Sequence, residues 1–159
     1  MNGMISRLLW IKSNITPGMI DKFKQAINDA AETLREQATQ FGEGAKEKSY
    51  KLIEEWLTIF PKLEIYGLEI RSFALSVAIS PALEVELVGK HEDFRSERLD
   101  EIIQETRKNA ALASVFTTIR TTYNLHRRTY ANLNDPLVVK IRVRISPEIK
   151  VYLGKPLIE

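Results

Sequence analysis

Residues 73–87 read FALSVAISPALEVEL, and residues 139–153 read VKIRVRISPEIKVYL. Both stretches alternate apolar with other residues on each side of an Ile-Ser-Pro step, which is the period of a β-strand with one buried face. In the first stretch, Pro81 suits the second position of a type I turn. We therefore predict two amphipathic β-hairpins. In the first hairpin, the expected pairs on the apolar face are Ile79 with Leu83, Val77 with Val85, and Leu75 with Leu87.

The two hairpins also match each other when the sequence is shifted by 66 residues. Six of the eleven positions from 77 to 87 are then identical, and a Gly-Lys pair follows each hairpin. A shared period of two explains part of this match, but it does not explain the common Ile-Ser-Pro turn. The match indicates an internal duplication of a helix-plus-hairpin unit. We expect a single domain over residues 1–159, with repeats at about 17–90 and 91–155.

A long amphipathic helix is predicted before the first hairpin. Thr16 can cap its start, and Pro17 suits the first helical position. Gly42 and Gly44 interrupt the stripe, so the segment is either one helix with a kink or two helices joined there. Pro61 is expected to end it, and a β pattern that slips in phase near Gly67 should follow. The apolar stripe contains Ile20, Phe23, Ile27, Ala30, Leu34, Ala38, Phe41, Ala45, Ile53, Trp56, Leu57 and Phe60.

A second long helix is predicted before the second hairpin, starting near Asp93 or Ser96 and reaching about Ala131. Its stripe contains Leu99, Ile102, Ile103, Thr106, Ala110, Ala113, Phe116, Ile119 and Tyr123. The predicted fold class is α+β, with two α-β-β repeats that form a four-stranded antiparallel sheet covered on one face by two long helices. Because both stripes are longer than the strands, the pattern favours a homo-oligomer, and a dimer above others.

Motifs that carry chemistry are not found in the chain. There is no cysteine, and the two histidines, His91 and His126, have no second His or Cys at ligand spacing. The His91-Glu92-Asp93 cluster is interpreted as a helix cap, and the Gly42–Gly44 region as a hinge rather than a phosphate-binding loop. Serines lack the context of a nucleophile elbow. We therefore predict no enzyme, no catalytic residue, no cofactor and no metal site.

Hydropathy gives a weaker indication of location. No apolar run approaches the roughly 20 residues that span a bilayer. The short apolar patch at residues 8–11 is expected to pack on the core, and the alternative is an interfacial membrane anchor with Trp10 at the headgroups. The lack of cysteine fits a reducing compartment, so a cytoplasmic location is expected.

Charge is unevenly distributed over the 159 residues. Residues 1–105 hold 13 Lys+Arg against 18 Asp+Glu, whereas residues 106–159 hold 10 against 3. The polar faces of the hairpins repeat this contrast, with Glu84 and Glu86 in the first and a basic set in the second. The candidate residues for binding an anion or a partner are Lys140, Arg142, Arg144, Lys150, Tyr152, Arg127 and Arg128.

Several interpretations of this basic set stay open. It can be a solvated face without a ligand, or it can meet the acidic residues, either across the strands of one sheet or in another subunit. It can also bind nucleic acid or an anionic membrane surface. The preferred hypothesis is a non-catalytic binding or assembly module that self-associates through its helices and charged sheet faces. The alternative is a nucleic-acid-binding protein that uses the basic C-terminal half.

Overall fold

The fold is α+β, as predicted, and consists of helices and one antiparallel sheet. A computed structural model of the chain describes residues 29, 45–77 and 81–158. The predicted helix start at Thr16 and the apolar patch at residues 8–11 lie outside this part. The described elements are α3 (Ala45–Ile65), β1 (Glu69–Ser76), β2 (Ala82–Gly89), the 3-10 helix η1 (His91–Phe94), α4 (Ser96–Thr106), α5 (Ala110–Arg127), β3 (Leu137–Val143) and β4 (Pro147–Leu153).

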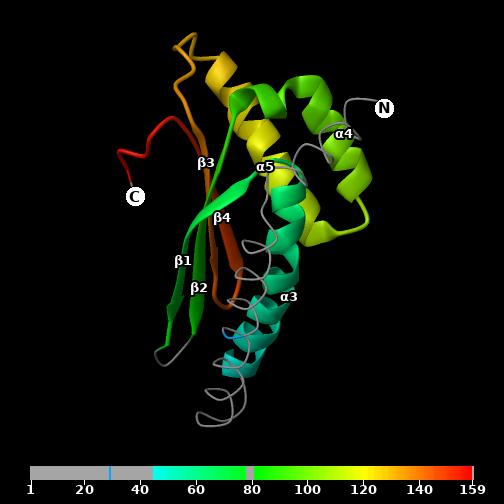
Figure 1. The fold of residues 1–159 in the computed structure, drawn as a ribbon, viewed down its shortest axis with the longest axis vertical. Coiled ribbons are helices and arrows are strands. Elements are labelled where there is room, and N and C mark those ends of the chain that lie inside the picture. Colours follow the sequence, from blue (N-terminus) through cyan, green and yellow to red (C-terminus); the bar gives the residue numbers. More distant parts are fainter. Residues whose placement is uncertain (1–28, 30–44, 78–80, 159) are drawn as a thin grey trace.

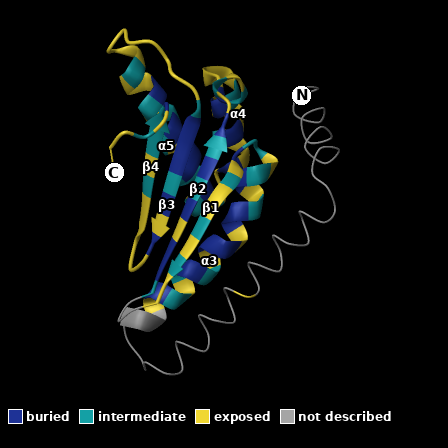
Figure 2. Ribbon diagram, turned by 60° about the vertical axis from the view of Figure 1, so that its left-hand side comes forward, coloured by how far each residue is buried: buried dark blue, intermediate teal, exposed yellow. Residues whose placement is uncertain are grey.

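The sheet has four strands in the order β1-β2-β3-β4, and all neighbours are antiparallel. Helices α3 and α5 contact one face of it, and Figure 1 shows all three described α-helices on that side. Burial is deepest on the central strands β2 and β3 and on the helix surfaces that face them (Figure 2). The central strands contribute Leu83, Val85, Leu87, Val139, Ile141 and Val143 to the core.

Helix α3 does not end at Pro61, as the sequence pattern suggested, but runs on to Ile65. The N–H of Leu68 donates to the Leu63 carbonyl over 3.2 Å, and the N–H of Gly67 donates to the Glu64 carbonyl over 3.1 Å. These two bonds form a Schellman motif, whose left-handed position is taken by Gly67 at φ 111°. Gly67 therefore terminates a helix, and the change of phase expected within a β pattern at this residue is not found there. The bulge lies further on, between Ile70 and Ser72.

The prediction of a second long helix is also wrong, because this segment forms two helices, α4 and α5. Asn109 is the N-cap of α5, and its side chain accepts a hydrogen bond from the N–H of Leu112 over 3.1 Å. Helix α4 folds back and contacts α5. The apolar stripe predicted for the second long helix is thus partly covered within the chain, so its length no longer favours a dimer.

The first hairpin is paired four residues away from the predicted register. Leu83 lies opposite Leu75 rather than Ile79, and Val85 lies opposite Phe73. The reason is the place of the prolines, because Pro81 directly precedes β2 and Pro147 is the first residue of β4, where a strand tolerates the missing N–H. Val77 and Ile145, both predicted on the apolar face, are consequently 43% and 63% exposed, and Ile79 lies outside the described residues.

The observed registers of the two hairpins nevertheless correspond under the shift of 66 residues. The pair Leu75–Leu83 in the first hairpin corresponds to Ile141–Ile149 in the second. The next pairs toward the open end, Phe73–Val85 and Val139–Val151, correspond in the same way. Equivalent residues of the two halves therefore occupy equivalent pairing positions.

Aromatic residues join the helices to one another. The ring of Phe116 in α5 makes an edge contact with Tyr66, with centroids 5.2 Å apart, and stacks on Phe94 at 6.4 Å. Trp56 in α3 is 1% exposed and lies near Phe60. Trp56, a member of the predicted apolar stripe, therefore belongs to the core of a single chain.

Glu64 gives a pH-dependent prediction. Burial raises its pKa and the nearby Glu69 raises it further, while a hydrogen bond of 3.1 Å from the N–H of Ile70 opposes the rise. A carboxyl group whose pKa is higher in the folded state loses stabilisation as pH rises through that value. We expect Glu64→Gln to gain stability relative to the wild type as pH rises from about 4 to about 7, measured by urea unfolding. The exposed Glu92→Gln is the control, and a gain that is independent of pH would contradict the prediction.

Candidate functional site

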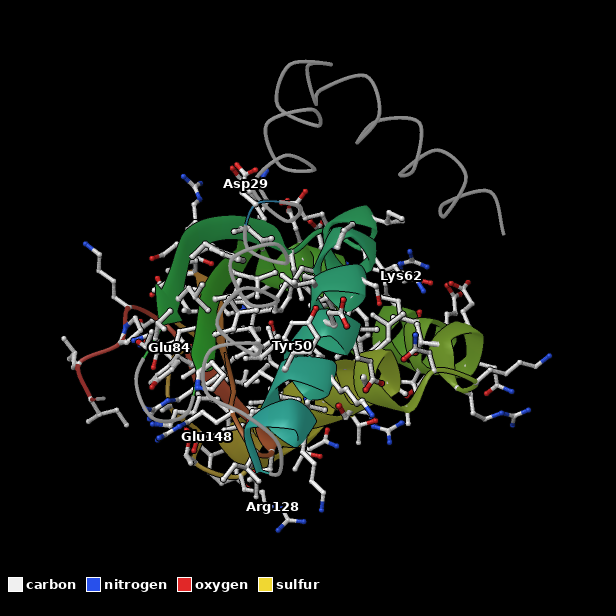
Figure 3. The ribbon with its side chains drawn as sticks, turned by 90° about the horizontal axis from the view of Figure 1, so that it is seen from below. Asp29, Tyr50, Lys62, Glu84, Arg128 and Glu148 are labelled. Carbon is white, nitrogen blue, oxygen red and sulfur yellow. The ribbon has the colours of Figure 1, made fainter. Side chains whose placement is uncertain are left out.

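The candidate residues in the second hairpin lie mostly on the outer face of the sheet, which is the face turned away from α3 and α5. Figure 3 shows Glu84 and Glu148 on this side, whereas Lys62 of α3 lies on the other. The register brings β2 and β3 together as neighbours, with Glu84 directly opposite Arg142 and Glu86 opposite Lys140. The acidic and basic hairpins thus meet at the centre of one sheet.

Two ion pairs join charges of the outer face within the chain. The Arg142 Nε atom lies 3.1 Å from Glu84 Oε1, and both side chains are about half exposed. On β4, Lys150 Nζ lies 3.4 Å from Glu148 Oε1. The ammonium group of Lys140 lies 5.1 Å from the centroid of the Tyr152 ring. Ion pairs at such exposure contribute little stability, at most about 1 kcal/mol each.

Acids and bases are mixed on the outer face, so that it does not form one basic platform, although Lys140 lies directly opposite Lys150. Among the described residues of β2, β3 and β4, this face carries three acids and three bases. The acids are Glu84, Glu86 and Glu148, and the bases are Lys140, Arg142 and Lys150. A polyanion approaching the four central charges would therefore meet carboxylates beside each basic group.

Arg144 is not one of these six charged residues of the outer face and lies at the turn between β3 and β4. Its N–H donates to the Ser146 carbonyl over 3.3 Å. Together with Arg142, Ile145, Ser146 and Glu148 it lines an open hollow of about 360 Å³. The hollow mixes two guanidinium groups with a carboxylate and an exposed aliphatic side chain, so its lining does not define one ligand.

Arg127 and Arg128 lie at the other end of the sheet. Both are exposed at the C-terminal end of α5, close in sequence to the start of β3. The β3–β4 turn is separated from that end by the seven residues of β3, or roughly 23 Å. The candidate set is therefore divided into an outer-face group, a turn residue and a pair at the end of α5. Figure 1 shows the end of α5 and the β3–β4 turn at opposite ends of the sheet.

His91 has a different role from the helix cap that we predicted. The N-cap residues are Lys90 for η1 and Arg95 for α4, and neither side chain makes a capping hydrogen bond. Instead, His91 Nδ1 lies 2.7 Å from the hydroxyl of Tyr123, and Nε2 lies 2.6 Å from the carbonyl oxygen of Asn134. The ring thereby joins η1 to α5 and to the segment that leads into β3.

The hydrogen bonds of His91 indicate which ring nitrogen carries the proton. A carbonyl can only accept, so Nε2 carries a proton and donates to Asn134. In the neutral ring, Nδ1 then accepts from the hydroxyl of Tyr123. Burial raises the pKa of Tyr123 above its ordinary value, and the charge of Asp135 adds to the rise, so its hydroxyl stays protonated. Because both ring nitrogens are engaged, the arrangement supports a structural role for His91.

Other kinds of site have little support in the described part of the chain. Within residues 29, 45–77 and 81–158, no group of three or more His, Cys, Asp or Glu could hold a metal ion. None of the helices described has the length and apolar composition needed to cross a membrane. Comparison with known proteins finds no matching family model, curated protein or solved structure. The function must therefore be inferred from the surfaces of the chain itself.

Proposed function

We propose that this chain is a non-catalytic binding and assembly module that forms a homodimer through the outer face of its sheet. The observation that carries the proposal is the acidic strand β2 lying beside the basic strand β3, on a face that no described helix covers. A cytoplasmic setting, and an origin by internal duplication of residues 17–90 and 91–155, belong to the same proposal. Equivalent pairing in the two hairpins supports the duplication.

The geometry of the charges suits a two-fold dimer. Closed homodimers use the same surface on both subunits. A two-fold axis parallel to the strands, placed above the seam between β2 and β3, would set β2 of each copy against β3 of the other. Because Glu84 and Arg142 are level along the strands, as are Glu86 and Lys140, each acid would then face a base of the second copy. The duplicated halves would have diverged in charge to create this complementarity.

The nucleic-acid alternative has less support, because carboxylates interleave with the basic groups of the outer face. Self-association through long helices also has less support, because α4 covers part of α5 within the chain. The outer face is the surface that a second copy of the chain would complement, because its acids would face bases.

Charge reversal tests the proposal. One variant carries Lys140→Glu with Arg142→Glu, and a second carries Glu84→Lys with Glu86→Lys. Each makes the seam uniformly charged, so each alone should be monomeric, with self-association at least about tenfold weaker, since like charges across an interface cost several kcal/mol. Mixing the two variants should restore a dimer, because every acid of one then faces a base of the other. Analytical ultracentrifugation at low and high salt measures this.

Like charges on neighbouring strands also lower the folding stability of each variant by itself. The mixture therefore distinguishes a loss of dimerisation from a loss of folding, because only a folded variant can form the heterodimer. Thermal unfolding of each variant therefore accompanies the mass measurements. A wild type that stays monomeric at high micromolar concentration would remove the proposal. A wild-type dimer with no heterodimer in the mixture would move the interface away from this seam. Added DNA or RNA that binds at low salt would favour the alternative.

A further inference from the structure

The loop that follows α5 presents apolar and basic side chains together. Leu125 is 55% exposed, Tyr130 95% and Leu133 46%, and the exposed Arg127 and Arg128 lie between them in the chain. We define these five residues as the α5-loop patch. The three apolar side chains fall within nine residues of the chain, and exposed apolar surface that is gathered in one region marks an interaction site.

The loop is held in place on both sides of Tyr130. The Thr129 hydroxyl donates to the carbonyl of His126 over 2.7 Å and accepts from the N–H of Ala131 over 3.2 Å. Further along, the carbonyl of Asn134 accepts from His91. Tyr130 itself has φ 56°, in the left-handed region that is strained for a bulky residue. The Tyr130 ring is therefore exposed to solvent on a backbone conformation that is unfavourable for its residue type. Strained backbone conformations cluster at functional positions.

From these observations we infer that the α5-loop patch docks on an anionic lipid surface. A tyrosine ring suits the headgroup level, leucines insert among the upper acyl chains, and arginines bind lipid phosphates. Residues 121–134 contain Arg127 and Arg128 and no Asp or Glu, so the charge of the patch itself complements a negative bilayer. Arg120, further back on α5, is paired with Asp100. The nearest acid in sequence, Asp135, is largely exposed and lies 3.7 Å from His91, two residues beyond the patch.

Other occupants fit the patch less well. A second copy bound by a two-fold axis would bring the Arg127–Arg128 pairs of the two chains together, and like charges would repel. Single-stranded nucleic acid would use stacking on aromatic rings, but the patch offers one ring and two aliphatic side chains. The inference goes beyond self-assembly and uses a different surface, at the end of the sheet opposite the β3–β4 turn.

The test is co-sedimentation of the full chain with vesicles of equal parts phosphatidylglycerol and phosphatidylcholine. Arg127→Gln with Arg128→Gln should weaken binding about fivefold for each arginine removed. Tyr130→Asp with Leu133→Asp should weaken it at least about tenfold, because both insertions are lost. The control, Arg144→Gln with Ile145→Asp, changes similarly exposed residues at the other end of the sheet and should bind like the wild type. Binding of the wild type should fall with added salt and on pure phosphatidylcholine vesicles.

The positions changed are exposed, so unfolding curves should be close to that of the wild type. Patch variants that bind vesicles as well as the wild type would overturn the inference and would place any lipid binding elsewhere on the chain. Wild-type binding to a single-stranded oligonucleotide but not to vesicles would also overturn it. The dimer is measured separately by mass without vesicles, so failure of one proposal leaves the result for the other intact.

Discussion

Replacing Phe116 with alanine is expected to lower the free energy of unfolding by about 3–5 kcal/mol. The ring is fully buried and lies between Tyr66, at the end of α3, and Phe94 in η1. Removing it would leave a cavity among three separate elements, none of which can move in without breaking other contacts. Urea unfolding of the purified variant measures the loss as a lower midpoint with a similar slope.

The matched control is Leu125→Ala on the same helix, because Leu125 is 55% exposed. Its truncation should change the free energy of unfolding by no more than about 0.5 kcal/mol. If Phe116→Ala also costs less than about 1 kcal/mol, the α5 surface that carries Phe116 is not packed against α3 and η1 as described. The comparison therefore tests which face of α5 is buried.

The strands could be predicted from the sequence, because apolar residues alternate every two residues, which is also the period at which strand side chains face the core. The residues predicted for the apolar face of β2, namely Leu83, Val85 and Leu87, are all in the core. Their partners on β1 were wrong by four residues, because a proline is compatible with both a turn and the first position of a strand. Alternation fixes which face a residue takes, but a shift of four residues preserves that face, so the pattern could not distinguish the two registers.

Helix boundaries were less predictable, because a break need not disturb the apolar stripe. Thr106 and Ala110 are four residues apart and continue one stripe, although the chain between them leaves the helix. The signal for the break was Asn109, an N-cap residue. Gly67 was a similar signal for the end of α3, but the apolar residues Leu63 and Ile65 before it also fit a strand.

The candidate surfaces depend on contacts between residues far apart in sequence. Inverted charge on the two hairpins was visible in the sequence, and one of the interpretations left open, pairing across strands of one sheet, is realised by Glu84 and Arg142. The exposure of Tyr130 could not be foreseen, because Tyr is an acceptable member of a helical stripe. The contacts of His91 with residues 32 and 43 positions away leave no local signature.

His91 and Tyr123 provide the second large effect, in a double-mutant cycle. His91→Ala should lower the free energy of unfolding by about 1–3 kcal/mol, because it leaves the partly buried Tyr123 hydroxyl without its acceptor. Tyr123→Phe should cost about 1–2 kcal/mol, because Nδ1 of His91 then lacks a donor. Both changes remove the same hydrogen bond, so the double variant should cost less than the sum by about 1 kcal/mol.

The control for this cycle is His126→Ala, because His126 lies in the last turn of α5 and its backbone carbonyl, which binds Thr129, is retained. It should change stability by no more than about 0.5 kcal/mol. Additive effects of His91→Ala and Tyr123→Phe would mean that the two side chains act independently and that the 2.7 Å contact contributes nothing. A coupling near the expected value would instead show that His91 joins η1 to α5, because no other described contact is removed by both changes.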